Sequence, residues 1–327
     1  MTSLKLLSFN AQGLSNFKKR KAVFSWCKAQ KADLIFLQET HSTKGCEKRW
    51  KNEWGGKNVF MSHGKSNARG ACILITNNLD FQLQKHVSDD HGRMVLLKAR
   101  VNGTDYSFVN IYAPNESNVA VDFFYKLKSI LTLEDIEAGN NVIIGGDFNC
   151  VLNPLLDRYT TSRVNNYDPK IHVANSIREI ISFFELQDAW RIKNPTTRSY
   201  TWRHSGKYQF SRIDFWLTSS HLQDSCIDSN IQYGIRSDHS AITMKIEVNQ
   251  IRRGPGFWKF NEVLLLDEEY NQSTHALIKS ILAENREFAN VNSLWEWLKY
   301  NVRKHTIAFS EEKLLELAKK RRIWKTP

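Results

Sequence analysis

A series of short apolar runs limits the possible folds of this chain more than any other feature of its sequence. Eight runs occur in the first 248 residues: LKLLSFN at 4–10, DLIFLQE at 33–39, ACILIT at 71–76, MVLLKARV at 94–101, YSFVNIYA at 106–113, NVIIGGDFN at 141–149, SRIDFWL at 211–217 and SAITMKIEV at 240–248. Turn-forming residues bound most of them, which is typical of β-strands. Several are apolar at nearly every position, as expected for strands buried on both faces.

Apolar residues at helical spacing occupy two stretches between these runs. One group recurs at i, i+1, i+4, i+7 and i+8 within 123–131, and a second recurs at similar spacing within 173–184. Each group would place one apolar stripe of a helix against a sheet. Strands with interspersed helices predict an α/β fold of the layered sandwich type, in which two packed β-sheets are flanked by helices.

The C-terminal part of the chain differs in character from the rest. Segment 249–261 contains Gly-Pro-Gly, a signal for a turn or linker, and residues 262–327 read as helical. Ser310 followed by two glutamates resembles a helix start, and the Lys-Lys-Arg-Arg run at 319–322 resembles a helix end. We therefore predict a domain at 1–248, a linker at 249–261 and a helical extension at 262–327. Because no closing element follows, we expect a piece of a longer protein.

Composition excludes several classes of protein. Hydrophobic residues make up 41% and charged residues 24%, as in ordinary globular chains. A run of about 18 apolar residues is missing, so no membrane partner is expected. The five cysteines are scattered without a CxxC pair, which predicts free thiols in a reducing compartment and no structural zinc. The net charge of +12 favours a polyanionic partner such as nucleic acid. The alternative is a basic soluble protein without such a partner, and charge alone does not decide between the two.

Polar residues lie at or near the ends of the apolar runs, where sheet edges commonly hold functional sites. They are Asn10, Glu39, Asp147, Asn149, Asp214, Asp238 and His239. Carboxylate and amide oxygens suit Mg²⁺, which can offset charge on a phosphate oxygen. A carboxylate can accept a proton from water, and a histidine held by a carboxylate can stabilise charge in a transition state. Zinc is disfavoured because the set holds one histidine and no cysteine.

Each motif alone has a simpler interpretation. GGDFN is also typical of a turn, Glu39 of a solvated strand end, and Asp238–His239 of a turn with a surface histidine. Asp214 is harder to dismiss because a carboxylate inside an apolar strand costs free energy unless it has a partner. The order and spacing of the whole set are much more specific than any member.

The segments SFNAQGL, IFLQET, NIYAP, GGDFN, SRIDFW and SDHSA, in this order, closely resemble the endonuclease/exonuclease/phosphatase superfamily, which includes DNase I, exonuclease III and apurinic endonucleases. The resemblance covers residues 3–248. It implies a four-layered, DNase I-like α/β sandwich and a Mg²⁺ cofactor, for which Mn²⁺ can substitute.

Further segments resemble the endonuclease of LINE-type non-LTR retrotransposon polyproteins. They are LDR at 156–158, SYTW before SRID, and GPGFWKFNEVLLLDEEY, which resembles the segment upstream of the reverse transcriptase. This implies a DNA endonuclease that nicks double-stranded DNA and leaves a 3′-hydroxyl to prime reverse transcription. Element RNA would be a partner through the full polyprotein, and the location would be nuclear. The run at 319–322 is also consistent with a nuclear address, a polar helix end or an RNA contact.

The resemblance implies roles for individual residues. Metal binding falls to Glu39, Asn10 and Asp238. Asp147 would orient or deprotonate the attacking water, Asn149, Tyr112 and His239 would contact the phosphate, and Asp214 would orient His239. Arg158, Thr201 and Ser211 align with DNA-contacting positions. Basic candidates for the DNA backbone are Arg69, Arg158, Arg163, Arg203 and Arg212, although a solvated surface explains any single one equally well.

Target choice is expected from loops over the site. Residues 196–212 join basic and aromatic side chains and predict either a hairpin that reads DNA shape or an ordinary hairpin with buried aromatic residues. Apurinic endonucleases usually carry Asp where this chain has Gln12, which favours the retroelement branch. The alternatives are an abasic-site repair endonuclease, a phosphoesterase for lipid or nucleotide substrates, and a catalytically dead nucleic-acid-binding module.

Overall fold

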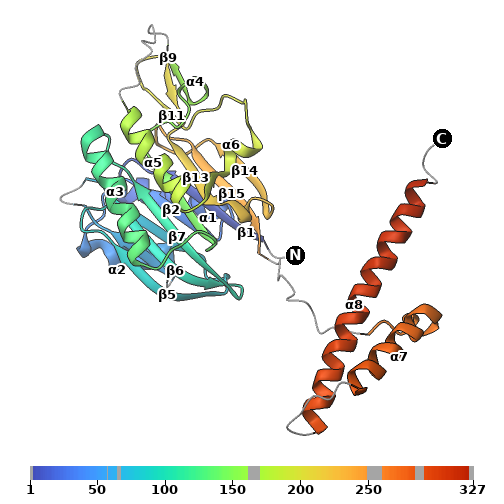
Figure 1. Cartoon of the computed structure of the whole chain (residues 1–327). Helices are drawn as coiled ribbons and strands as arrows, with labels where there is room; N and C mark the ends of the chain where they lie inside the picture. Colours follow the sequence, from blue (N-terminus) through green and yellow to red (C-terminus); the bar gives the residue numbers. More distant parts are fainter. Residues whose placement is uncertain are drawn as a thin grey trace. The chain divides into compact units, whose positions relative to one another are not determined.

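The computed structural model describes residues 3–56, 58–64, 68–160, 170–248, 260–283 and 291–323. The chain divides into two compact units, Met1–Ile251 and Arg252–Pro327 (Figure 1). Each unit is described separately below. The predicted linker at 249–261 lies mostly outside the described residues, so its structure stays a prediction.

The first sheet of the larger unit has the N-terminal strand near its centre. Its spatial order is β14 (Cys226–Gln232), β15 (Ala241–Glu247), β1 (Ser3–Asn10), β2 (Leu34–Gln38), β4 (Ala71–Ile75) and β3 (Val59–Ser62). Strands β1 and β2 are parallel and the other pairs are antiparallel. Parallel pairing places the ends of β1 and β2 at the same sheet edge, next to Asn10 and Glu39.

The second sheet packs on the first. Its spatial order is β10 (Leu186–Asp188), β13 (Asp214–Ser219), β8 (Val142–Asp147), β7 (Thr104–Tyr112), β6 (Met94–Val101) and β5 (Phe81–Ser88). Strands β7 and β8 are parallel, and β13 runs antiparallel to β8 with Asp214 opposite Asp147. The end of β8 and the start of β13 therefore meet at one edge.

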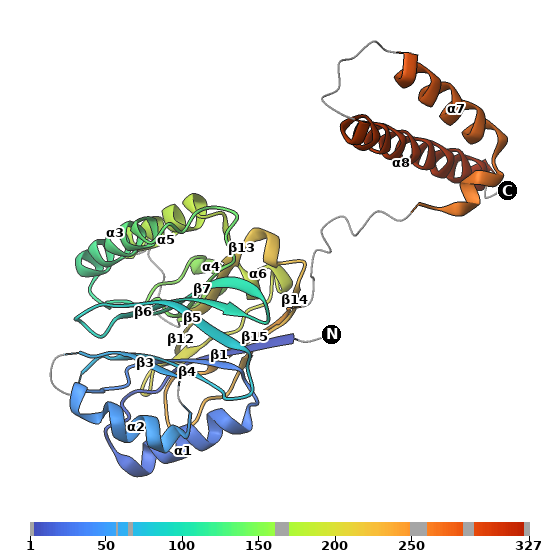
Figure 2. The same ribbon diagram turned by 90° about the horizontal axis from the view of Figure 1, so that it is seen from below.

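Helices cover the outer face of each sheet (Figure 2). Helices α1 (Phe17–Ala29) and α2 (Glu47–Trp54) cover the first sheet, and α3 (Ser117–Leu133) and α5 (Ile171–Phe183) cover the second. A third apolar core fills the space between the sheets. This helix–sheet–sheet–helix order confirms the predicted four-layered sandwich.

Short elements complete the larger unit. They are the 3₁₀ helices η1 (Lys44–Cys46) and η2 (Ser220–Leu222), the helices α4 (Pro154–Asp157) and α6 (Ala189–Lys193), and a small sheet of β11 (Trp202–Arg203), β12 (Gln209–Ser211) and β9 (Arg158–Thr160). Strands β11 and β12 form the hairpin expected within 196–212. Its aromatic side chains stack across the small sheet, where Phe210 lies 5.8 Å from Tyr159 and 5.8 Å from Tyr200 between ring centroids.

The Gly-Gly pair of GGDFN lies inside strand β8, so the turn interpretation is wrong. A Cβ on Gly145 would lie 2.1 Å from the Trp216 ring, and one on Gly146 would lie 2.0 Å from the Ile111 carbonyl oxygen. Gly146 also has φ 139°, a conformation that side chains rarely adopt. These glycines let β8 approach its neighbours closely, which places Asp147 at the sheet edge.

The smaller unit consists of η3 (Glu262–Leu266), α7 (Glu268–Ala283) and α8 (Val291–Ile323). The predicted helix start at Ser310 is wrong, because α8 is continuous there and the Ser310 hydroxyl donates to the Thr306 carbonyl. Helices α7 and α8 pack through Tyr270, whose hydroxyl lies 2.7 Å from that of Thr306. None of the helices in the described ranges is long and apolar enough to span a membrane.

Candidate active site

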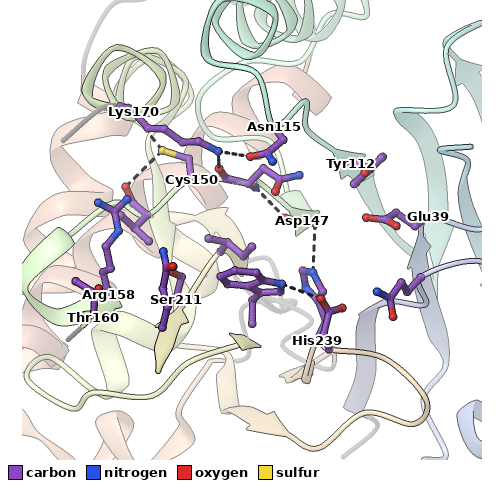
Figure 3. Close-up of a pocket in the computed structure, with 17 residues that line it drawn as sticks. Glu39, Tyr112, Asn115, Asp147, Cys150, Arg158, Thr160, Lys170, Ser211 and His239 are labelled. Atoms are coloured by element: carbon purple, nitrogen blue, oxygen red, sulfur yellow. Dashed lines mark hydrogen bonds and ion pairs between the residues drawn. The ribbon is translucent and has the colours of Figure 1, made fainter. Parts of the chain in front are cut away.

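The strand ends of both sheets converge on one pocket of about 580 Å³. Glu39 follows β2 in the first sheet, while Tyr112 and Asp147 end β7 and β8 in the second. Figure 3 shows Glu39 and Tyr112 at one end of the pocket, Asp147 and His239 near its middle, and Arg158 and Lys170 at the other end. Residues that are distant in the sequence are therefore brought together in one pocket.

Asn10 connects carboxylates of the two sheets. Its Nδ2 atom donates to Oε1 of Glu39 at 3.0 Å and to Oδ2 of Asp147 at 2.9 Å. Its Oδ1 atom accepts the backbone N–H of Gln12 at 3.0 Å. Asn10 is fully buried behind the pocket, so its observed role is to hold its neighbours in place. Direct metal ligation by Asn10 stays a prediction.

Two of the site residues have a left-handed backbone conformation. Glu39 and Asn149 both have φ 48°, which is uncommon outside glycine and concentrates at functional sites. The backbone N–H of Asn149 donates to Oδ1 of Asp147 at 2.8 Å, and its side chain donates to the Ala113 carbonyl at 2.9 Å. The sharp turn after β8 therefore fixes both members of the Asp-x-Asn pair.

His239 lies between two buried carboxylates. Its Nδ1 atom is 2.9 Å from Oδ2 of Asp214, and its Nε2 atom is 3.9 Å from Oδ2 of Asp147. Burial alone would lower the pKa of His239, but Asp214, then Asp147 and Asp238, outweigh it and raise the pKa to about 10. The three carboxylates therefore favour the cationic form of the imidazole. The partner expected for Asp214 is confirmed as His239.

Burial and neighbouring charge raise two further pKa values in the pocket. Burial is the largest cause for Asp147, followed by the nearby Asp214 carboxylate, while His239 acts in the opposite direction. A raised pKa makes the Asp147 carboxylate a stronger proton acceptor. Burial also raises the pKa of Tyr112, with Glu39 and Asp147 adding to the effect, so its hydroxyl stays protonated and can donate a hydrogen bond.

The donor set fits a hard divalent cation. Asp147, Asp214 and His239 place ligand-type atoms within 4.8 Å of one another. A protonated imidazole cannot ligate a metal, so this cluster is better interpreted as an ion-paired triad. Glu39 and Asp238 line the same pocket and offer carboxylate oxygens, the ligands that Mg²⁺ prefers. An ion would be held on the Glu39 side of the site.

Two residues expected to contact DNA are buried by their own contacts. Arg212 is 1% exposed and is paired with both oxygens of Asp157 and with Asp188, at 2.7–3.1 Å. Thr201 is fully buried, and its hydroxyl accepts the N–H groups of Ile213 and Asp214. The DNA-contact prediction is therefore wrong for both, because neither side chain reaches the surface.

The other DNA-binding candidates lie at the surface or in the pocket. Arg158 and the largely buried Ser211 line the pocket. Arg69 and Arg203 are exposed, and the Arg203 guanidinium lies 5.2 Å from the centre of the Tyr233 ring. Arg163 lies outside the described residues. Contact between DNA and the accessible members stays a prediction.

Lys170 and Asn115 line the pocket but were missed in the sequence. The Lys170 ammonium donates to the Asn149 carbonyl oxygen at 2.7 Å and to Oδ1 of Asn115 at 2.6 Å (Figure 3). Asn115 follows NIYAP by one residue, which is a usable signal. No sequence motif includes Lys170, so only the folded structure shows that it reaches the site.

Comparisons with known proteins agree with this geometry. A model of the Endonuclease/Exonuclease/phosphatase family matches residues 7–239. Over 297 residues, the chain is 31% identical to the Transposon TX1 uncharacterized 149 kDa protein of Xenopus laevis. That match covers 90% of this chain but only 22% of the transposon protein, so this chain spans a small part of that relative.

Solved structures of other proteins share the fold, among them the three that follow. The APE2 catalytic domain of Xenopus laevis has a TM-score of 0.60 at 20% identity, covering 76% of this chain and 94% of its own. The AP endonuclease LMAP of Leishmania major has a TM-score of 0.64 at 17% identity, covering 75% and 88%. An AP endonuclease of Archaeoglobus fulgidus has a TM-score of 0.58 at 19% identity, covering 75% and 100%. Identities this low support the fold alone.

Proposed function

The chain belongs to the endonuclease/exonuclease/phosphatase family, and from that membership we propose that it is a Mg²⁺-dependent endonuclease that nicks one strand of DNA. The observation that carries the proposal is the convergence of Glu39, Asp147 and the Asp214–His239 pair on one pocket. When bound, the divalent ion would offset charge on the scissile phosphate and stabilise the leaving oxygen. Glu39 and Asp238 would hold it.

Asp147 is positioned to act on the attacking water. Asn10 and the Asn149 N–H fix its two oxygens, and burial raises its pKa. A carboxylate that is rigidly held and more basic than usual is suited to accept a proton as water attacks phosphorus. Asn149 stands beside it on the same turn, within reach of the same phosphate.

His239 supplies a fixed positive charge. Asp214 binds its Nδ1 atom, so Nε2 is the ring atom that remains for a phosphate oxygen. A charged donor that is already oriented stabilises negative charge as it develops, without reorganisation during the reaction. The protonated Tyr112 hydroxyl provides a second donor at the pocket end that holds Glu39.

Double-stranded DNA is the proposed substrate. The chain has a net charge of +12, and Arg158 and Lys170 bring cationic side chains to the pocket end away from Glu39. Cationic contacts to phosphates give affinity that falls as salt rises. The β11–β12 hairpin stands beside the pocket through Trp202 and Gln209, which supports a role in recognising DNA shape.

We further propose a role in retrotransposition. The similarity to a transposon protein extends beyond residues 7–239 into the C-terminal part of the chain, which supports an origin in a longer polyprotein. The nick would leave a 3′-hydroxyl that primes reverse transcription of element RNA, which the rest of the polyprotein would bind. This reaction requires access to chromosomal DNA, so a nuclear location is part of the proposal.

The proposal is tested by nicking of supercoiled plasmid with and without Mg²⁺, followed by mapping of the cut ends. We expect open circles only with the ion, bearing 3′-hydroxyl and 5′-phosphate ends. Plasmid that binds but remains supercoiled in every divalent ion would instead support a binding module without catalysis.

A repair endonuclease for abasic sites is the second candidate, because two structures with a similar fold, from Leishmania major and Archaeoglobus fulgidus, are AP endonucleases by name. Comparison of duplexes with and without one abasic site separates the two. Strong preference for the abasic duplex would favour repair, and similar rates on both would favour target nicking.

A further inference from the structure

Thr201 and Trp202 connect parts of the site that are distant in sequence. The Thr201 hydroxyl accepts the backbone N–H of Asp214 at 3.1 Å, and the Thr201 carbonyl accepts the N–H of Ser240 at 2.6 Å. Trp202 pairs with Ser211 in the hairpin and forms a bridge with His239 on its other side. The first strand of the hairpin is thereby fixed to the segment that carries Asp238 and His239.

One side-chain hydrogen bond crosses this junction. The indole Nε1 of Trp202 donates to Oδ2 of Asp238 at 2.9 Å, and the N–H of Arg203 donates to the Asp238 carbonyl at 3.2 Å. Both the backbone and the carboxylate of Asp238 are thus held by the hairpin strand. Trp202 and Asp238 also line the pocket that contains Glu39.

An indole is well suited to orient a carboxylate. It has a single donor and no acceptor, and its ring has few rotamers once it is packed. Binding one oxygen fixes the plane of the carboxylate and leaves the second oxygen for a cation. Groups that orient metal ligands in this way commonly change metal affinity about 10- to 100-fold when they are removed.

We propose that Trp202 is a positioning residue for the divalent-ion site, acting through the hydrogen bond from its indole N–H to Asp238. The inference rests on the proposed function and deepens it, because it assigns a residue of the hairpin to metal binding. The hairpin would then serve the ion site as well as the DNA.

Trp202→Phe tests the hydrogen bond because it keeps an aromatic ring and removes the donor. Trp54→Phe is the matched control: it also removes one indole hydrogen bond, from Nε1 to the Ile75 carbonyl, in a buried cluster beneath the first sheet. The full chain of each variant is titrated with Mg²⁺ and Mn²⁺ by calorimetry and by ion-dependent thermal shift. Nicking is then measured across the same range of Mg²⁺ concentrations.

We expect Trp202→Phe to bind the ions about tenfold more weakly than Trp54→Phe, with nicking largely recovered at saturating Mg²⁺. A double-mutant cycle with Asp238→Ala should be non-additive, since each change removes the contact between the indole and the carboxylate. Equal ion affinity in the two tryptophan variants, additive effects in the cycle, or an unmodified chain that binds no divalent ion would overturn the inference. Weakened ion binding in Trp202→Phe without nicking by any variant would overturn the proposed endonuclease and leave the inference standing.

Discussion

Oδ2 of Asp214 lies 2.9 Å from Nδ1 of His239, and both side chains are almost completely buried. A carboxylate and an imidazole buried together stabilise each other's charged forms. The pair therefore fixes both the orientation and the charge of the histidine, and each can be tested separately.

Removal of the Asp214 charge should move the alkaline limit of nicking to lower pH. The pKa of His239 is raised to about 10, so its cationic form predominates at neutral pH and is lost as pH rises through the pKa. In Asp214→Asn the pKa should fall, and the rate should decline between about pH 7 and pH 9 where the unmodified chain does not. Rates measured at steps across this range provide the check, and parallel profiles would contradict the charge role. His239→Ala should be slower by roughly 10²- to 10⁴-fold at every pH.

Glu39→Gln should abolish Mg²⁺-dependent nicking while the chain remains folded. The change keeps the acceptor for the Asn10 side chain but removes the charge offered to the cation. Nicking and the thermal shift produced by Mg²⁺ should both be lost, while the melting temperature without metal should change little. Full activity in this variant would remove Glu39 from the ion site.

The strand pattern of the sequence predicted the layered fold because buried strands have a strong apolar signal. The polar strand β5 was missed, since most of its side chains are exposed at the sheet edge. Helices α1 and α2 were missed too, and α1 has a weak apolar stripe because Arg20 is among its buried residues.

For the candidate site too, the sequence pattern predicts some features and misses others, here at the level of single residues. The polar strand ends predicted a common site. In the structure, parallel pairing brings Asn10 next to the end of β2 in the first sheet and Tyr112 next to Asp147 in the second. The direction of a side chain is harder to predict. The prediction that Arg212 contacts DNA is wrong for this reason. Arg212 lies between β12 and β13, and its partners Asp157 and Asp188 are distant in the sequence, so no local pattern shows that its side chain is buried.

Deletion of residues 249–327 should leave a folded chain that still nicks DNA. The larger unit contains both sheets and every residue that lines the pocket. We expect plasmid nicking within a few-fold of the full chain, compared at equal Mg²⁺ and salt. Loss of nicking with an unchanged circular dichroism spectrum would show that the helical unit belongs to the active enzyme.

Glu53 should contribute stability that disappears in acid. The Arg20 guanidinium binds both carboxylate oxygens of Glu53, at 2.6 and 2.9 Å, and holds the pKa of that carboxyl below its usual value. Its stabilising effect is present above the unfolded pKa and is lost as pH falls through the lower folded value. Urea unfolding of Glu53→Gln and the unmodified chain should therefore differ at neutral pH, and the difference should shrink as pH falls below the unfolded carboxyl pKa of about 4.3. A constant difference down to pH 3 would contradict this assignment.

Variants of two nearby arginines should separate a structural role, which we assign to Arg212, from a DNA-binding role, which we assign to Arg203. Arg212 is buried on Asp157 and Asp188, so Arg212→Met removes a charged partner from both buried carboxylates and should cost roughly 3–5 kcal/mol of unfolding free energy. Arg203 is exposed, so Arg203→Met should change stability by less than about 0.5 kcal/mol. Urea unfolding of both variants measures these costs.

The same variants should rank in the opposite order in DNA binding. If Arg203 contacts a phosphate, Arg203→Met lowers the slope of log affinity against log salt by about one unit. Arg212→Met should leave that slope unchanged at temperatures where the chain is folded, because a guanidinium enclosed by carboxylates releases no counterions from DNA. Binding to a duplex is measured without divalent ions at several salt concentrations. A reduced slope for Arg212→Met, or a stability loss for Arg203→Met as large as that for Arg212→Met, would show that the two roles are wrongly divided.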